Sequence, residues 1–217
     1  MKQTLWEQLI TQFTMRWEDL GVAAFQHMEL VLISMLLAIV VGVPLGITVT
    51  RFPFLKSWVL GGTGILQTIP GLALLGFMIP LFGIGIKTAI AALFLYSLLP
   101  IVRNTYTGIQ DVDKVLIEAA KGMGMKNVQI LCKIELPLAL SVIMAGIRTA
   151  TVINVGTATL AAFIGAGGLG DFIFIGIQRN IDALILIGAL PAALLAIVLD
   201  YLLGGLEKLT TPRGLKI

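Results

Sequence analysis

The residues of this chain that could carry out chemistry are few and widely spaced. Cys132 and His27 are the only residues of their types, and a metal site needs several converging ligands, none of which lie near either residue in the sequence. A nucleophilic enzyme needs a nucleophile beside a base, but Ser34, Ser97 and Ser141 have no histidine or lysine nearby within their apolar segments. The residue types therefore argue against metal-dependent and nucleophilic catalysis.

The most distinctive stretch runs from Glu118 to Pro137 and is a long polar interruption of an apolar sequence. From residue 112 to residue 123 the apolar positions recur at the spacing of a single helix face. Either Asp111 or Asp113 could cap the start of this helix. Four lysines make the segment basic, namely Lys114, Lys121, Lys126 and Lys133.

Two glycines, Gly122 and Gly124, are expected to end this first helix. A second apolar set follows the glycine turn and consists of Val128, Leu131 and Ile134. Pro137 then stands where the next helix would begin, because the missing N–H of proline costs least in a first helical turn. The stretch therefore predicts two short helices joined by a turn.

The composition places the chain in a membrane. Apolar residues make up 58% of the 217 residues, only 12% are charged, and the mean hydropathy is +0.99. Such a chain has room for about five or six spans of roughly 20 residues and no separate soluble catalytic domain. The formal charge of +3 is too small to indicate nucleic-acid binding.

The pattern predicts an all-α integral membrane protein with about five transmembrane helices. The candidate spans are at about residues 28–50, 58–82, 86–104, 136–164 and 181–204, each long enough to cross a hydrocarbon core of about 30 Å. Residues 1–20 are predicted to form an amphipathic helix, about 105–136 a polar loop, and 206–217 a tail. A short helix near 168–178 is expected after a glycine turn, and a sixth span or re-entrant helix at 165–180 stays open.

Lysine and arginine residues orient these spans. If the chain starts outside, the inner segments hold Arg51, Lys56, Arg103, Lys114, Lys121, Lys126, Lys133, Lys208, Arg213 and Lys216, and the outer ones hold Lys2, Arg16, Lys87 and Arg179. This excess of inner positive charge predicts an N-out, C-in topology with the polar loop in the cytoplasm.

Polar and helix-breaking residues inside the spans indicate a path through the membrane or an interface. The candidate path residues are Gln67, Thr68, Pro70, Tyr96, Arg148, Thr151 and Asn154. Arg148 lies roughly 15 Å from the inner end of its span, whereas Asp200, its obvious partner, lies about one turn from the inner end of the last span. We therefore expect Arg148 to face a cavity, with a structural ion pair as the alternative. Gly42 and Gly46 form a GxxxG motif that predicts close helix packing.

The polar stretch resembles the EAA loop of ABC importer permeases, E-A-A-x3-G-x9-I-x-L-P. Every specified position is matched, by Glu118, Ala119, Ala120, Gly124, Ile134, Leu136 and Pro137. The resemblance implies that these residues couple the permease to an ATPase, and an ordinary helix pair between two membrane helices is the alternative.

Two further stretches refine the resemblance. LQTIPGLALLGFMIPLFGIG at 66–85 and GAGGLGDFIFIGIQ at 165–178 resemble the osmoprotectant branch of these permeases. Residues 21–205 are thus similar to a type I ABC importer transmembrane domain, which implies import of glycine betaine, carnitine or choline. GAGGLG also resembles methionine permeases, so a methionine or other amino-acid importer is the alternative. A channel or membrane scaffold is less favoured, because neither would explain the EAA pattern.

The resemblance also implies the partners. These are a dimer of ATP-binding cassette ATPase subunits, a second permease copy or paralogue, and an extracytoplasmic substrate-binding protein, in the multi-pass setting of a bacterial or archaeal cytoplasmic membrane. The chain has no GxxxxGK[ST] phosphate loop. We therefore expect a transport subunit that is not an enzyme, with no cofactor of its own, beside an ATPase that binds ATP and Mg.

Overall fold

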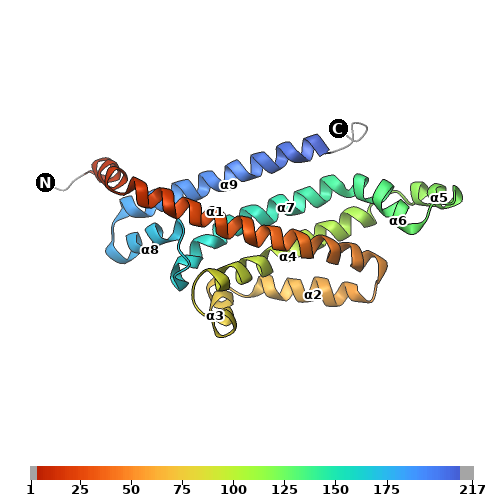
Figure 1. Ribbon diagram of the computed structural model, residues 1–217, viewed down its shortest axis with the longest axis horizontal. Coiled ribbons are helices and arrows are strands. Elements are labelled where there is room, and N and C mark those ends of the chain that lie inside the picture. Colours follow the sequence, from red (N-terminus) through yellow and green to blue (C-terminus); the bar gives the residue numbers. More distant parts are fainter. Residues whose placement is uncertain (1–3, 211–217) are drawn as a thin grey trace.

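A computed structural model describes residues 4–210, and all the regular elements in that range are helical (Figure 1). They are α1 (Leu5–Arg51), α2 (Leu55–Thr68), α3 (Gly71–Phe82), α4 (Ile86–Gln110), α5 (Lys114–Gly122), α6 (Asn127–Ile130), the π-helical η1 (Leu131–Glu135), α7 (Leu136–Ala158), the 3-10 segment η2 (Thr159–Ile164), α8 (Gly170–Arg179) and α9 (Asp182–Thr210). The predicted all-α class is confirmed.

Four stretches are long and apolar enough to cross a membrane, and a bent pair of helices can count as a fifth. The four are α1, α4, the stretch Asn127–Ile164 that contains α7, and α9. The second predicted span, 58–82, is not one straight helix, because α2 and α3 are bent by 106°. Pro70 follows Ile69 at this bend, and Ile69 has the extended backbone (φ −71°, ψ 127°) that a residue before proline prefers.

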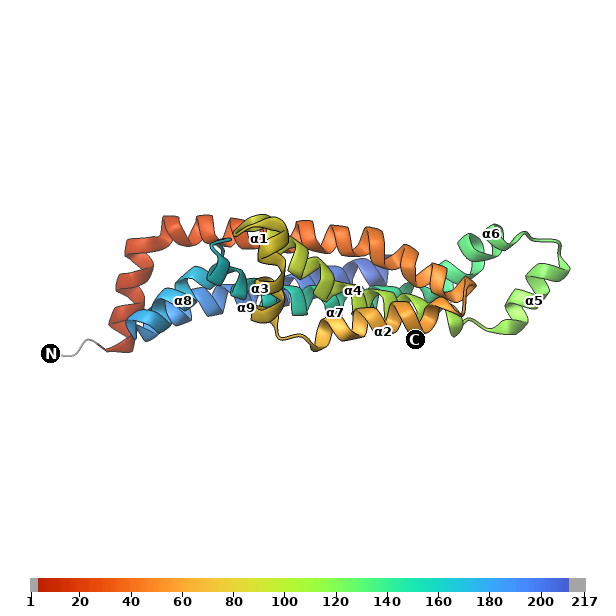
Figure 2. The same ribbon diagram turned by 90° about the horizontal axis from the view of Figure 1, so that it is seen from below.

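The N-terminal amphipathic helix is continuous with the first span. Thr4 caps α1, accepting from Glu7 N at 3.3 Å while Thr4 N donates to the Glu7 carboxylate at 2.9 Å. The helix bends at Arg16, where φ is −129°, so the first turns point away from the rest (Figure 2). The predicted separation of 1–20 from the first span is therefore a kink and not a loop.

The core of the bundle lies where α4 packs between α1 and α7. Buried residues of these helices form it, including Leu30, Val31, Ala38, Leu93, Ile101, Ile143 and Ala150. The GxxxG motif permits close approach, since a Cβ on Gly42 would lie 2.9 Å from Ile101 Cγ2 and one on Gly46 would lie 2.6 Å from Thr105 Cβ. The expected packing role of the motif is confirmed.

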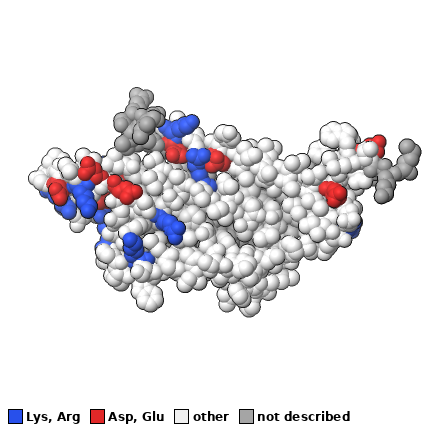
Figure 3. Space-filling view, turned by 180° about the vertical axis from the view of Figure 1, so that it is seen from behind, with Lys and Arg blue, Asp and Glu red and all other residues white. Residues whose placement is uncertain are grey.

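The surface of the bundle is largely apolar. Large side chains such as Phe25, Leu36, Trp58, Ile84 and Leu190 are exposed. Figure 3 shows that charged side chains gather over the end formed by α5 and α6 and near the C-terminal end of α9, while the wide middle of that face carries other residues. Such a surface suits a lipid environment.

The last third of the chain contains the expected short helix and a last span that is longer than predicted. The short helix expected near 168–178 is present as α8 and lies outside the four long apolar stretches. α9 continues to Thr210, so the first residues of the predicted tail are helical. Residues 211–217, together with Arg213 and Lys216, lie outside the described part of the chain, as does Lys2.

Candidate functional site: the coupling loop and the polar residues of the spans

The loop between α4 and α7 projects beyond the end of the bundle (Figures 1 and 2). Its first helix, α5, begins after Asp113, whose carboxylate accepts from Val115 N at 2.9 Å. Of the two capping residues left open by the sequence, Asp113 is thus the one that caps. Ala120 is fully buried, whereas Glu118 and Ala119 are exposed. Ala120 therefore packs one face of α5 inward, while Glu118 lies on the exposed side.

The turn after α5 depends on Gly124, which has φ +80°. Its N–H donates to Lys121 O at 2.9 Å, and Met125 N donates to Ala120 O at 3.1 Å. These bonds satisfy the last carbonyls of α5 and turn the chain toward α6. The prediction of a helix–turn–helix at this position is confirmed.

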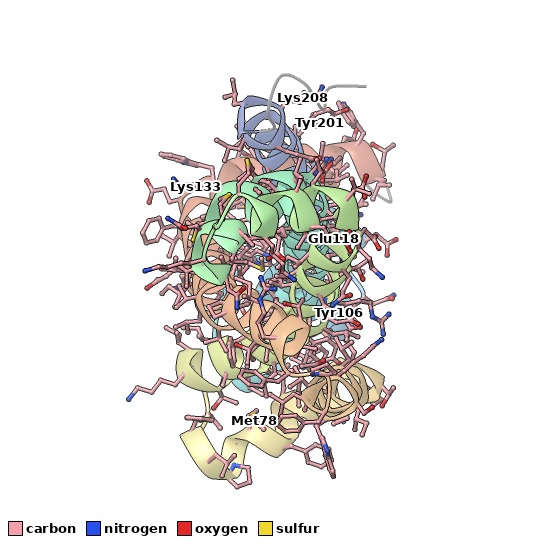
Figure 4. All side chains as sticks on the ribbon, turned by 90° about the vertical axis from the view of Figure 1, so that its right-hand side faces the viewer. Met78, Tyr106, Glu118, Lys133, Tyr201 and Lys208 are labelled. Atoms are coloured by element: carbon pink, nitrogen blue, oxygen red, sulfur yellow. The ribbon has the colours of Figure 1, made fainter. Side chains whose placement is uncertain are left out.

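The loop carries an exposed apolar patch. Its members are Val115, Leu116, Met123 and Val128, which are 68%, 46%, 75% and 71% exposed. All four lie on the projecting helices or on the turn between them, and Figure 4 looks onto this end with Glu118 labelled on α5. Exposed apolar side chains of this size are typical of a surface that a partner protein covers.

The end of the loop contains a feature that the sequence did not reveal. Residues 131–135 form the π-helical η1 before α7 begins, with Pro137 in the first turn of α7 as predicted. Ile134 and Leu136 flank the buried Glu135, whose carboxylate accepts two hydrogen bonds from Arg51 at the end of α1. The only signal of this contact in the sequence was that Glu135, at the position x of the I-x-L-P pattern, is charged.

The predicted path residues fall into separate groups. Gln67 Nε2 donates to Tyr96 O at 3.3 Å, and the Tyr96 hydroxyl donates to Ile69 O. Pro70 is exposed beside this contact, as is Thr68, whose hydroxyl donates to Ile65 O at 2.7 Å. Tyr96 thus supplies a donor to a carbonyl that the bend at Pro70 leaves without a helical partner.

Asn154 is fully buried and lies at the centre of the bundle. Its Nδ2 lies 3.0 Å from Ser34 Oγ, 2.8 Å from Ser97 Oγ and 3.3 Å from Leu93 O, and its two protons are shared among these acceptors. These contacts join α7 to α1 and α4. Thr151, one turn earlier, is also buried and donates to Ile147 O at 2.9 Å. Their polar atoms are satisfied by contacts inside this chain.

The sequence placed Arg148 and Asp200 at different depths and left an ion pair between them as the alternative, and the structure shows the ion pair. Arg148 Nε and Nη2 donate to the two Asp200 oxygens at 2.9 and 3.0 Å, and its Nη1 donates to Glu207 at 3.0 Å. The depths match because α9 continues to Thr210, so that Asp200 lies about 15 Å from the end of its helix.

The same arginine also faces open space. With Asp200, Thr149, Val152 and others it lines a groove of about 470 Å³, and the Arg148 side chain is 34% exposed. Pairing and exposure to a groove are therefore combined in one residue.

At the opposite end of the molecule a polar contact joins the turn before α8 to α1. Gly168 N donates to Gln26 Oε1 at 3.2 Å. Beside it, Asp171, Asp19 and Arg16 line an open pocket of about 290 Å³. Burial raises the pKa of the Asp171 carboxyl above its usual range.

Comparison with known families gives one match over most of the chain. A family model described as "Binding-protein-dependent transport system inner membrane component" matches residues 22–213.

Two similar relatives are permease proteins. The chain is 47% identical over 210 residues to the "Carnitine transport permease protein OpuCB" of Listeria monocytogenes, covering 97% of this chain and 96% of that protein. It is 50% identical over 191 residues to the "Glycine betaine/carnitine/choline transport system permease protein OpuCB" of Bacillus subtilis (strain 168), covering 88% of each.

A solved structure shares the fold. A chain of the MetNI methionine ABC transporter, in an inward-facing conformation, superposes with a TM-score of 0.81 at 25% identity, covering 92% of this chain and 99% of that one. The chain thus shares its fold with a subunit of an ABC importer.

Proposed function

This chain belongs to the family of binding-protein-dependent transport system inner membrane components, and we propose that it forms the translocation path of an ATP-driven importer for quaternary ammonium osmoprotectants. The observation that carries the proposal is identity of 47–50% over most of the chain to permeases named for carnitine, choline and glycine betaine. The chain is a multi-pass membrane subunit, and ATP is hydrolysed by a separate ATPase subunit of such importers.

The coupling loop is the proposed contact with that ATPase. In support, α5 and α6 project from the bundle, and the patch formed by Val115, Leu116, Met123 and Val128 is exposed. The residues proposed to couple are those of the EAA pattern, with Glu118 exposed on α5 and Gly124 forming the turn. ATP and Mg would bind to the ATPase and not to this chain.

A permanently charged trimethylammonium group cannot cross hydrocarbon unaided. Two permease chains would therefore enclose a polar path, and closure of two ATPase subunits would open that path to one side at a time. An extracytoplasmic binding protein would deliver the solute. The path residue that the structure supports is Arg148, because it lines a groove and is partly exposed.

The orientation and setting are also proposed. The distribution of lysine and arginine favours an N-out, C-in arrangement that places α5 and α6 in the cytoplasm. The proposed location is the cytoplasmic membrane of a bacterium or archaeon.

Uptake by the reconstituted complex tests the substrate. The complex of this permease with its ATPase and binding protein, in liposomes loaded with ATP, should accumulate choline, carnitine or glycine betaine. Unlabelled methionine should not compete. The fold similarity to a methionine transporter makes methionine the second candidate, and competition by methionine equal to that by glycine betaine would favour it.

A further inference from the structure

Two charged side chains, 84 residues apart, meet at the joint between the coupling loop and the bundle. Glu135 ends η1 with its side chain only 4% exposed, and Arg51 ends α1 with its side chain 39% exposed. Arg51 Nη1 donates to Glu135 Oε1 at 3.2 Å, and Nη2 donates to Oε2. Because a buried carboxylate needs a partner, this two-pronged contact fixes the end of α1 against η1.

The pair lies where the helix geometry changes. Residues 131–135 are π-helical, between the α-helical turn of α6 and the long helix α7. π-helical turns are rare, occur mostly as single turns inside α-helices, and are found frequently at functional sites. They also allow the flanking α-helical segments to bend relative to each other. Glu135 therefore stands at the junction through which any movement of the loop reaches α7.

Three helices meet the loop at this junction, but only two of them are joined to it by the backbone. α4 enters the loop after Gln110, and α7 leaves it at Leu136. α1 is distant in the sequence and packs closely on α4 through Gly42 and Gly46. The ion pair gives α1 a direct polar contact with the loop as well.

We propose that the Arg51–Glu135 pair is the connection through which α1 follows the coupling loop, so that both are positioning residues for converting ATP hydrolysis into transport. The proposal rests on the function proposed above. During the cycle, the ATPases would move α5 and α6, η1 would bend, and the pair would carry α1 along with α7. Without the pair, α7 would move while α1 lagged, and the path would open incompletely.

A merely stabilising ion pair would have a different signature. Its loss would reduce the amount of assembled complex, while each complex that did assemble would still transport the normal amount of solute per ATP. If the pair instead connects α1 to the loop, its loss should leave assembly normal and lower the amount of solute transported per ATP. The ratio of uptake to ATP hydrolysis therefore separates the two roles.

The test uses the complete complex in liposomes, with labelled choline and ATP hydrolysis measured in the same preparation. The main variant is the double change Arg51→Ala with Glu135→Gln, because it removes both charges and leaves no buried carboxylate unpaired. We expect it to assemble and to lose severalfold in choline uptake per ATP. The exchange Arg51→Glu with Glu135→Arg should recover most of that loss.

Two further variants sharpen the result. Arg51→Lys keeps the charge but not the two-pronged contact, so its uptake per ATP should fall by an intermediate amount. Lys56→Ala is the matched control, since Lys56 is also basic and follows α1 closely. Its Nζ lies 4.9 Å from the centre of the Tyr106 ring on α4, so its contact is with α4 and not with η1. It should leave the ratio unchanged.

Wild-type uptake per ATP in the double variant would overturn the connection, as would an equal loss in Lys56→Ala. If the double variant does not assemble, Arg51→Lys decides, and a wild-type ratio there overturns the proposal. A wild-type complex that takes up no choline, carnitine or glycine betaine would reject the proposed function itself. A wild-type complex that transports normally, together with variants that have the same uptake per ATP, would reject only the role of the ion pair.

Discussion

The guanidinium of Arg148 on α7 binds both carboxylate oxygens of Asp200 on α9, at 2.9 and 3.0 Å. Its remaining nitrogen contacts Glu207, also on α9, at 3.0 Å. α9 is the least buried of the four long apolar stretches, since 28% of the residues in its 18-residue apolar segment are buried. α9 also packs buried apolar residues, among them Leu184, Ile187 and Ala192, against the bundle, and the charge network adds a polar attachment beside an open groove.

Arg148→Ala should lower solute uptake while the ATPase stays bound, because the change does not touch the coupling loop. It should also loosen α9, since Asp200 and Glu207 lose the same partner. Copurification of the ATPase, complex yield and uptake should be measured together. The exchange Arg148→Asp with Asp200→Arg restores the ion pair but reverses the charge at the groove. Full recovery of uptake in that variant would contradict a path role for Arg148.

Asn154→Ala should destabilise the bundle without a specific effect on transport per ATP. The two amide protons shared among Ser34, Ser97 and Leu93 are lost, and each interhelical hydrogen bond is worth roughly 0.6 kcal/mol within a membrane, so we expect a loss of ~1 kcal/mol plus a cavity cost. Thermal unfolding of the purified complex measures this. Thr157→Ala is the control, because its hydroxyl only donates to Ile153 O within α7. An equal loss in both variants would contradict the central role of Asn154.

Gly46→Val should disrupt the contact of α1 with α4. The added Cβ alone would lie 2.6 Å from Thr105 Cβ, and the helices would have to separate, at a cost of about 1 to 3 kcal/mol for overpacking. Gly205→Val is the control, since a Cβ there meets nothing within 4 Å. Thermal stability should fall only in the first variant. If Thr105→Gly restored the stability of Gly46→Val, the close contact would be established as the cause.

Local patterns in the sequence predicted the structure of the loop between α4 and α7 well. The cap at Asp113, the turn at Gly124 and the start of α7 at Pro137 each depend on a few adjacent residues whose backbone preferences are strong. The GxxxG contact was also predictable, because small residues at that spacing allow two membrane helices to pack closely. The long apolar stretches followed from composition and length.

The features that escaped prediction depend on contacts across the chain or on the ends of helices. The Arg51–Glu135 pair joins residues 84 positions apart, and no local pattern signals a π-helical turn. The Arg148–Asp200 pair was kept only as the alternative, because the end of α9 was placed too early by a few residues. Pro70 was recognised as a helix breaker, but its presence alone did not indicate that α2 and α3 are bent by 106°.

Cys132 offers a test of the orientation. It is exposed on η1, and the charge distribution places this segment in the cytoplasm. In intact cells, a membrane-impermeant thiol reagent should not label Cys132, and labelling should appear after permeabilisation. The variant Cys132→Ser provides the background. Ready labelling of intact cells would reverse the topology and remove the proposed contact with the ATPase.

Gly124→Val should separate coupling from folding. Gly124 has φ +80°, which a β-branched residue resists, and left-handed geometry costs about 1 to 2 kcal/mol for a residue with a side chain. Because a Cβ at this position would meet nothing within 4 Å, the cost comes from the backbone alone. The turn should therefore change shape and misdirect α6, while the spans still insert and pack.

Gly122→Val is the matched control for this variant. Gly122 is the last residue of α5, has no positive φ, and also has open space at the Cβ position. We expect both variants to reach the membrane, but only Gly124→Val should lose the ATPase or hydrolyse ATP without responding to solute-loaded binding protein. Membrane level, ATPase copurification and stimulated hydrolysis should be measured on the same preparations. Normal stimulated hydrolysis and uptake in Gly124→Val would show that the geometry of this turn does not transmit the movement of the ATPase.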